Sequence, residues 1–364
     1  MARQLVLWGP PIVSSDVGDA DYASDIQGWV ERISDVGITK TIPGATNPVV
    51  VDAANKKGIA VHPYVNYTAF PSYGNRSQAY GWSLSFLREA LDAPGTRDIL
   101  DGHRAVFDGP TVGEEKLEPF AKDHPEWWSL ARDKRMTLKP GERRCMSLAF
   151  PEVRASQIQK FIDVFDESSE ADGIQVEIVL GNEDEGRTST YGYEDAVAGA
   201  FEKKHGKSPF DIPNDDPDWL RFRADYVTSF LAELRDAVKE AHPEAQFTTT
   251  MIAGDPDDYI KVLQDWPRWL DKGIVDELYV WWRTHSDPKV VERQVRHVAE
   301  IVKGRVPFIA ELSCYHPGSF QTTERMVEGA RIALDNGADG VGVYRSHGVD
   351  QLGLWPALEQ MGKL

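Results

Sequence analysis

Short runs of apolar and β-branched residues alternate with longer amphipathic segments along most of the 364-residue chain. Each short run has the length and composition of a strand, and a helical pattern follows each of them. The predicted strands lie at 4–8, 38–42, 59–66, 173–180, 247–252, 275–282, 306–313 and 340–345. Eight strands that each precede a helix predict an α/β fold of the (β/α)8 TIM-barrel type.

The helical pattern is clearest at 217–241, where an apolar side chain recurs at every fourth position. Further helices are predicted at 22–36, 47–57, 151–170, 193–205 and 351–362. A doubly wound sheet is the alternative fold, but it would lead us to expect a glycine-rich dinucleotide turn after an early strand, and the sequence has none. The barrel is therefore favoured.

A long irregular stretch at 67–150 separates the third predicted strand from the helix at 151–170. It contains an amphipathic segment near 78–92 and the pair Trp127-Trp128. Loops of this length usually serve as lids or binding loops. We therefore expect a single barrel domain over 1–364, with 67–150 as a long insertion after the third strand.

The formal net charge of −18 makes this an acidic protein and narrows its partners. Nucleic acid and anionic membranes both require clusters of Lys and Arg, and none stands out. No apolar stretch of about 18 residues predicts a membrane span. A soluble protein is expected, either cytoplasmic or exported if a signal peptide has been removed. The two cysteines, Cys145 and Cys314, predict ordinary thiols. The sequence does not define the oligomeric state.

Candidate chemistry begins with carboxylates near the ends of two strands, because barrel active sites lie at the carboxyl ends. Side chains along a strand point alternately into the barrel and toward the helices. In the strand at 173–180 the apolar set is Val176, Ile178 and Leu180, which leaves Glu177 pointing into the barrel.

The same alternation applies to the strand at 306–313. There Ala310 and Leu312 form the apolar set, so Glu311 and Ser313 point inward. Buried carboxylates are tolerated only when they are paired or hydrogen-bonded. A pair of them can perform acid–base and nucleophilic chemistry, as in glycosidases. The alternative is that each Glu forms a buried ion pair with Arg or Lys.

A third candidate is Glu183, which follows Asn182 in the loop after the strand at 173–180. A solvated acidic loop explains this residue equally well. Aromatic and polar residues gather at the same strand ends, and such rings can stack on sugars while their polar atoms stay hydrated. The candidates for substrate binding are Trp8, His62, Tyr64, Asn66, Tyr191, Tyr279, Trp281, Arg283, Tyr344 and Arg345. Core packing is the alternative for any single ring, and Tyr191 and Tyr193 are placed in a loop that could close over the cleft.

No cofactor or metal ion is predicted. The histidines are scattered and lack a His-Glu-x-x-His spacing, and there is no phosphate-binding glycine loop. A metal site assembled from distant loops remains an alternative, because several histidines follow strands. These are His62, His124, His285, His316 and His347.

Three stretches of the chain resemble those of bacterial glycoside-hydrolase-like barrel proteins of the family-ten-like group. The first combines His124-Pro-Glu-Trp-Trp128 with the segment 145–154. The second is Asp172-Gly-Ile-Gln-Val-Glu177, and the third combines 191–194 with 219–225. The resemblance covers roughly residues 120–285 and extends to the rest of the chain only through the barrel pattern.

In such proteins an acidic residue after the Asp-Gly-Ile pattern, often Asp, is thought to be catalytic, and Glu177 holds that position here. The segment 309–312 also looks like the nucleophile segment of the larger retaining glycosidase clan. That clan places its acid/base after an Asn, which resembles Asn182-Glu183. The resemblance does not identify the sugar.

These observations predict a glycoside hydrolase that acts on an oligo- or polysaccharide. Glu311 is the expected nucleophile or base and Glu177 the general acid, with Glu183 as its substitute. A carboxyl separation of about 5 Å would indicate retention, and a clearly larger one inversion. Two other functions remain open: a barrel that binds carbohydrate without cleaving it, and a lyase or isomerase that uses a metal held by loop His and Glu.

Overall fold

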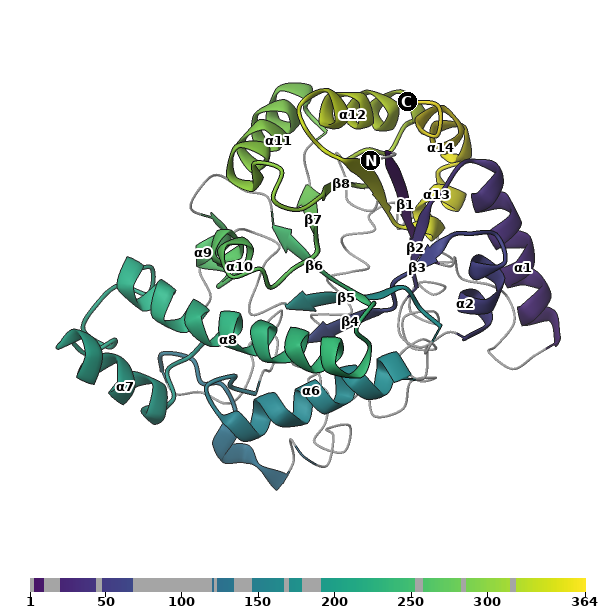
Figure 1. Ribbon diagram of the computed structural model, residues 1–364. Coiled ribbons are helices and arrows are strands. Elements are labelled where there is room, and N and C mark those ends of the chain that lie inside the picture. Colours follow the sequence, from purple (N-terminus) through teal and green to yellow (C-terminus); the bar gives the residue numbers. More distant parts are fainter. Residues whose placement is uncertain are drawn as a thin grey trace, which may run out of the picture.

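Parallel strands form the centre of the molecule and helices surround them, as the computed structural model in Figure 1 shows. The structure describes residues 3–9, 20–43, 48–67, 120, 123–133, 146–166, 170–178, 191–252, 258–282, 286–314 and 319–364. The described strands are β1 (Gln4–Trp8), β2 (Lys40–Ile42), β3 (Ala60–Val61), β4 (Tyr64–Tyr67), β5 (Gly173–Ile178), β6 (Gln246–Ile252), β7 (Glu277–Trp282), β8 (Phe308–Ser313) and β9 (Gly340–Tyr344). Their order in the sheet is β3-β2-β1-β9-β8-β7-β6-β5-β4.

The two end strands of this sheet, β3 and β4, are consecutive pieces of one segment separated by His62 and Pro63. β3 pairs with β2, and β4 pairs with β5. The backbone N–H of His62 donates to Thr41 O (3.1 Å), while Pro63 O accepts from the N–H of Gln175 (3.0 Å). The segment therefore closes the sheet into a ring, which confirms the predicted TIM-barrel fold. The strand predicted at 59–66 is interrupted at Pro63, since proline has no N–H to donate.

Helices lie outside the ring of strands, and α7 extends beyond the end of α8 (Figure 1). The longer helices are α1 (Ala20–Asp35), α2 (Pro48–Asn55), α6 (Pro151–Asp166), α7 (Asp195–His205), α8 (Pro217–Ala241), α11 (Pro288–Val302) and α12 (Thr323–Asp335). The shorter ones are the 3-10 turn η2 (Pro125–Trp127), α9 (Asp258–Lys261), α10 (Trp266–Asp271), α13 (Ser346–Gln351) and α14 (Trp355–Met361). None of the described helices is long and apolar enough to cross a membrane.

The strand residues divide between two apolar cores. Val176 and Leu312 belong to the large core between strands and helices. A small core fills the barrel lumen and consists of Val6, Trp8, Ile42, Tyr279 and Ile309, with Tyr64 and Tyr344 packed against it. The face on which each of these strand residues lies, toward the helices or toward the lumen, therefore agrees with the alternation expected from the sequence.

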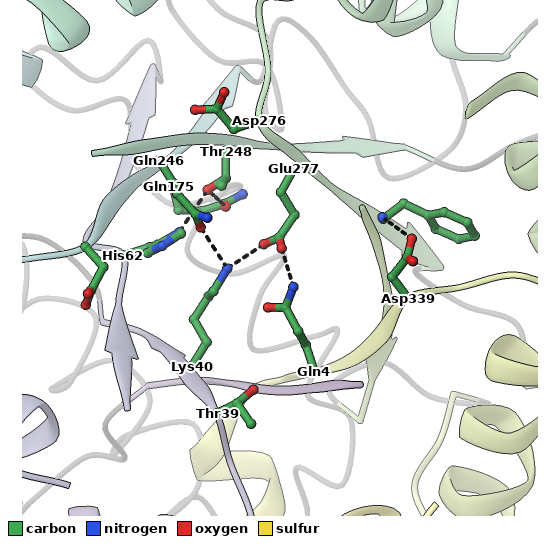
Figure 2. Close-up of polar contacts among 12 residues, drawn as sticks. Gln4, Thr39, Lys40, His62, Gln175, Gln246, Thr248, Asp276, Glu277 and Asp339 are labelled. Atoms are coloured by element: carbon green, nitrogen blue, oxygen red, sulfur yellow. Dashed lines mark hydrogen bonds and ion pairs between the residues drawn. The ribbon is translucent and has the colours of Figure 1, made fainter. Parts of the chain in front are cut away.

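Four strands are preceded by a side chain that accepts a hydrogen bond from the backbone N–H of the neighbouring strand. Three of these acceptors are aspartates, and Figure 2 shows Thr39, Asp276 and Asp339 around the lumen. The bonds are Leu5 N to Thr39 Oγ1 (3.1 Å), Val61 N to Asp172 Oδ2 (2.9 Å), Phe247 N to Asp276 Oδ2 (2.8 Å) and Phe308 N to Asp339 Oδ2 (3.0 Å).

The three bonds to aspartates lie at the amino ends of β5, β7 and β9 and so fix where each of these strands starts. Five residues after each Asp come Glu177, Trp281 and Tyr344, near the carboxyl ends of the same strands. The repeated aspartates thus set the positions of three candidate site residues. The insertion proposed for 67–150 lies mostly outside the described residues and stays a prediction.

Candidate active site

Glu177 on β5 and Glu311 on β8 both project into the barrel, and their side chains are buried, at 8% and 1% exposure. In the sheet register Glu177 pairs with Asn66 on one side and Thr250 on the other. Glu311 pairs with Trp281 and Gly342. The structure therefore directs two carboxyl groups from separate strands into one lumen.

The carboxyl group of Glu177 accepts a hydrogen bond from the phenol of Tyr64 on β4. Tyr64 is half-buried, and its ring meets the Trp8 ring edge to face, with 5.1 Å between centroids and 69° between planes. The residue that the sequence suggested for sugar stacking is thus bonded to a candidate catalytic group.

Glu311 lies between a glycine and a buried phenol. A Cβ built on Gly342 would come within 3.4 Å of Glu311 Cγ. Burial raises the pKa of Tyr279 well above its usual value, and the nearby Glu277 and Glu311 carboxylates raise it further. Tyr279 therefore stays neutral between two acidic side chains, and its fully buried ring helps to fill the lumen.

Trp8 is the centre of an aromatic cluster that we call the lumen cluster: Trp8, Tyr64, Tyr279 and Tyr344. The Trp8 centroid lies 5.3 Å from that of Tyr344 and 6.5 Å from that of Tyr279, again edge to face. Its indole Nε1 is buried and has no hydrogen-bond partner among the described residues.

A positive charge lies next to this cluster at the end of β9. The guanidinium of the half-buried Arg345 is 5.1 Å from the centroid of the Tyr344 ring. Trp8 and Tyr344 end β1 and β9, so two rings and the cation of Arg345 lie at the carboxyl ends of neighbouring strands. Such groups are able to contact a polar ligand.

Deeper in the barrel, a buried ion pair joins Lys40 on β2 to Glu277 on β7, with 2.6 Å between Nζ and Oε1. Gln4 Nε2 donates to Glu277 Oε2 (2.6 Å), and Lys40 Nζ also donates to Gln246 Oε1 (3.4 Å). Figure 2 shows these side chains pointing toward one another inside the ring of strands. Glu277, a residue that the sequence reasoning did not single out, thus forms a buried ion pair of the kind considered for Glu177 and Glu311.

His62 belongs to this deeper polar layer. It is fully buried, and its Nδ1 lies 3.3 Å from Thr248 Oγ1. Burial lowers its pKa well below 6.5, and the charge of Lys40 lowers it further. The structure therefore places His62 among the groups that fill the barrel, below the level of Glu177 and away from the expected substrate.

Tyr191 and Tyr193 are buried in a separate cluster beside α7 and α8. Tyr191 pairs with Ala131 in an antiparallel bridge, and Tyr191 O accepts from Arg223 (2.6 Å). The phenol of Tyr193 donates to Asn214 Oδ1 (2.8 Å). These contacts pack both tyrosines into the protein, so neither forms the closing lid that was expected.

The remaining candidates lie outside what the structure describes. This holds for Glu183 and Arg283, and for the side chains of Asn66 and Trp281. Their roles stay predictions. Among the described residues, no three His, Cys, Asp or Glu side chains are grouped so that they could hold a metal ion. Cys314 is a buried free thiol, and burial raises its pKa to about 12.

Residues 104–309 match the model of the protein family described as Glycosyl hydrolase-like 10. The chain belongs to this family. The match covers more than half of the sequence and includes β5 with Glu177, but it ends at residue 309 and so does not reach Glu311 on β8. The resemblance drawn from the three sequence stretches is confirmed. No match was found among curated proteins.

Solved structures similar to this glycosyl hydrolase-like chain share its fold at low identity. The PgaB (BpsB) glycoside hydrolase domain from Bordetella bronchiseptica matches with a TM-score of 0.62, 14% identity and 99% coverage of both chains. The β-galactosidases of Bacillus circulans sp. alkalophilus and Halorubrum lacusprofundi give TM-scores of 0.61 and 0.60 at 12% identity. Both matches cover all of this chain but only 55% and 58% of those enzymes.

Proposed function

We propose that the protein is a glycoside hydrolase that cleaves a glycosidic bond in an oligo- or polysaccharide. The observation that carries the proposal is the pair of buried carboxyl groups, Glu177 and Glu311, directed into the lumen of one barrel. Membership of a glycosyl hydrolase-like family supports the same chemistry. The sugar and the linkage are not part of the proposal.

In this proposal Glu311 acts as the nucleophile or as the base that activates water, and Glu177 as the general acid. The acid protonates the leaving oxygen while the other carboxylate attacks the anomeric carbon or removes a proton from water. Glu183 is the substitute for Glu177, because it follows the same strand. The anomer first released, read by NMR, would separate retention from inversion.

Within the lumen cluster, Trp8 and Tyr344 would bind the sugar ring next to the cleaved bond. The rings of the cluster come from four different barrel strands, and one of them, Tyr64, donates the hydrogen bond to Glu177. The buried Nε1 of Trp8 would donate to a sugar hydroxyl, and Arg345 would bind a second polar group. Aromatic side chains suit this task because they combine an apolar face with a polar atom.

The test is a glycan-library screen of the wild-type protein beside Glu311→Gln and Glu177→Gln. Each substitution keeps the shape of the side chain and removes the charge. We expect hydrolysis by the wild type, and a loss of several orders of magnitude in turnover for both variants at unchanged thermal stability. Glu292→Gln on α11, which alters an exposed carboxylate paired with Arg296, is the matched control and should keep full activity.

Undiminished turnover in Glu311→Gln would remove that residue from the mechanism. Saturable glycan binding without any hydrolysis by the wild type would instead identify a carbohydrate-binding barrel. Loss of turnover on adding a chelator, with recovery on adding a divalent metal ion, would contradict the carboxylate mechanism in favour of a metal-dependent lyase or isomerase.

A further inference from the structure

We propose that Tyr64 positions the carboxyl group of Glu177 and does not serve as a stacking surface for sugar. The inference deepens the proposed function and rests on it, because it assigns Tyr64 a role through a catalytic Glu177. Three observations carry it: the hydrogen bond from the Tyr64 phenol to Glu177 Oε2, the backbone bonds that fix Tyr64, and the packing of its ring.

The backbone of Tyr64 is held on both sides. Its N–H donates to Pro43 O (2.8 Å), and it pairs with Gln175 in the register of β4 and β5. Glu177 lies two residues further along β5 and so points into the lumen from the same face as Gln175. The break at Pro63 therefore starts β4 at a position from which the phenol reaches the carboxyl group.

The Tyr64 ring is fixed as well, because it packs edge to face against Trp8 with 5.1 Å between centroids. Trp8 is itself buried and meets Tyr344 and Tyr279 in similar arrangements. A ring that is braced in this way holds its hydroxyl group at one place. A freely stacking ring would instead adapt to each substrate.

The hydrogen bond has a consequence for proton transfer. The phenol O–H donates to Oε2 of Glu177, so Tyr64 holds one oxygen of the carboxyl group in place. A general acid keeps one oxygen as an acceptor when it is protonated, and Oε2 has that role here. The proton that Glu177 delivers to the leaving oxygen then resides on Oε1. Displacing a catalytic group by about 1 Å can lower the rate about 100-fold.

The distinguishing variant is Tyr64→Phe, which keeps the ring and removes only the hydroxyl group. Positioning predicts that kcat falls about 10- to 100-fold while KM changes by less than about twofold. Stacking predicts that both constants stay close to the wild-type values, because the ring face is intact, and this result would overturn the inference. Tyr193→Phe is the matched control. It removes another phenol that donates a hydrogen bond, at 2.8 Å to Asn214, and should leave kcat unchanged.

A second measurement does not depend on activity. Urea unfolding of the wild type, Tyr64→Phe, Glu177→Ala and the double variant forms a thermodynamic cycle. We expect Tyr64→Phe to lower the unfolding midpoint in the wild-type background and to leave it nearly unchanged when Glu177 is absent. Equal shifts in both backgrounds would overturn the inference. If the cycle shows that Tyr64 and Glu177 interact but Glu177→Gln keeps full turnover, Glu177 is not catalytic. The hydrogen bond would then exist without serving catalysis.

Discussion

At the scale of single residues, the barrel contains acidic groups at two depths in different surroundings. Glu277 is neutralised by Lys40 at 2.6 Å and accepts a further bond from Gln4. Glu177 accepts a hydrogen bond from the phenol of Tyr64. A buried ion pair such as Lys40–Glu277 mainly avoids the cost of an isolated buried charge.

His62 predicts how stability depends on pH. Its pKa in the folded protein is lowered by burial and by Lys40, while the unfolded chain has a value near 6.5. As the pH falls below about 6.5, the unfolded state takes up a proton that the folded state resists. The stabilisation is therefore complete above that pH and is lost toward acid, by up to about 1.4 kcal/mol per pH unit.

The measurement is the free energy of unfolding in urea between pH 5 and pH 8 for the wild type and His62→Gln. The glutamine keeps a polar group near Thr248 but does not titrate. We expect the wild-type curve to fall more steeply toward acid than the variant curve. Parallel curves would show that His62 is not held neutral in the folded protein.

The site could be predicted from the sequence to the extent that it follows from strand alternation. The period of two assigns Glu177 and Glu311 to the lumen, and the same rule applied to Tyr279 would also have assigned Glu277 there. Alternation does not give depth, however, so His62 was expected at the mouth. It also cannot reveal that Tyr64 bonds to Glu177, because that contact joins strands whose sequences are 113 residues apart.

At the scale of elements, the strands and long helices could be predicted well from the sequence. The predicted boundaries were wrong where a proline or a turn interrupts an element. The segment 59–66 reads as one apolar run, but Pro63 divides it into β3 and β4. The helix predicted at 351–362 corresponds to α14 but begins only at Trp355, after a turn that contains Gly353 at a φ of 65° and separates it from the short α13. Tyr191 and Tyr193 were predicted to lie in a closing loop because their neighbours in the sequence are polar residues and glycine. Those neighbours do not reveal that α8, which follows later in the chain, buries both tyrosines.

The glycines at the start of β5 and β9 follow an aspartate in the shared sequence Ala-Asp-Gly. A Cβ on Gly173 would lie 2.5 Å from Gln246 O and 2.9 Å from His62 Nε2. Gly340 has an equivalent clash, with Gln4 O at 2.6 Å. The neighbouring strand thus approaches these positions closely, which requires the absence of a side chain.

This close approach predicts that Gly173→Ala destabilises the protein by about 1–3 kcal/mol, because backbone atoms must move to admit a methyl group. The matched control is Gly199→Ala in α7, where the same methyl group meets nothing within 4 Å. That change should stabilise the protein by about 0.5–1 kcal/mol, as alanine favours the helix. Urea unfolding measures both, and equal effects of the same sign would contradict the packing argument.

At the scale of the whole molecule, closure of the barrel brings together residues that are far apart in the chain. The segment 60–67 joins β2 to β5 and thereby places Tyr64 between the first two strands of the chain and Glu177. Helices cover the outside of the ring (Figure 1), and the candidate groups face a lumen whose described walls are aliphatic, aromatic and polar. The charge of the entire protein then acts on whatever approaches this lumen.

The chain has 58 acidic and 40 basic residues, which gives the net charge of −18. An excess of one sign slows the approach of ligands of the same sign, and salt screens this effect over about 10 Å at 0.1 M. We therefore predict that kcat/KM for a polyanionic glycan rises about tenfold between 20 and 500 mM NaCl, while that for a neutral glycan of equal length changes less than about twofold. Arg345 beside Tyr344 is the opposing local charge. If the anionic glycan were hydrolysed faster at low salt, and Arg345→Gln abolished the difference, the local cation would govern substrate approach and the net charge would not.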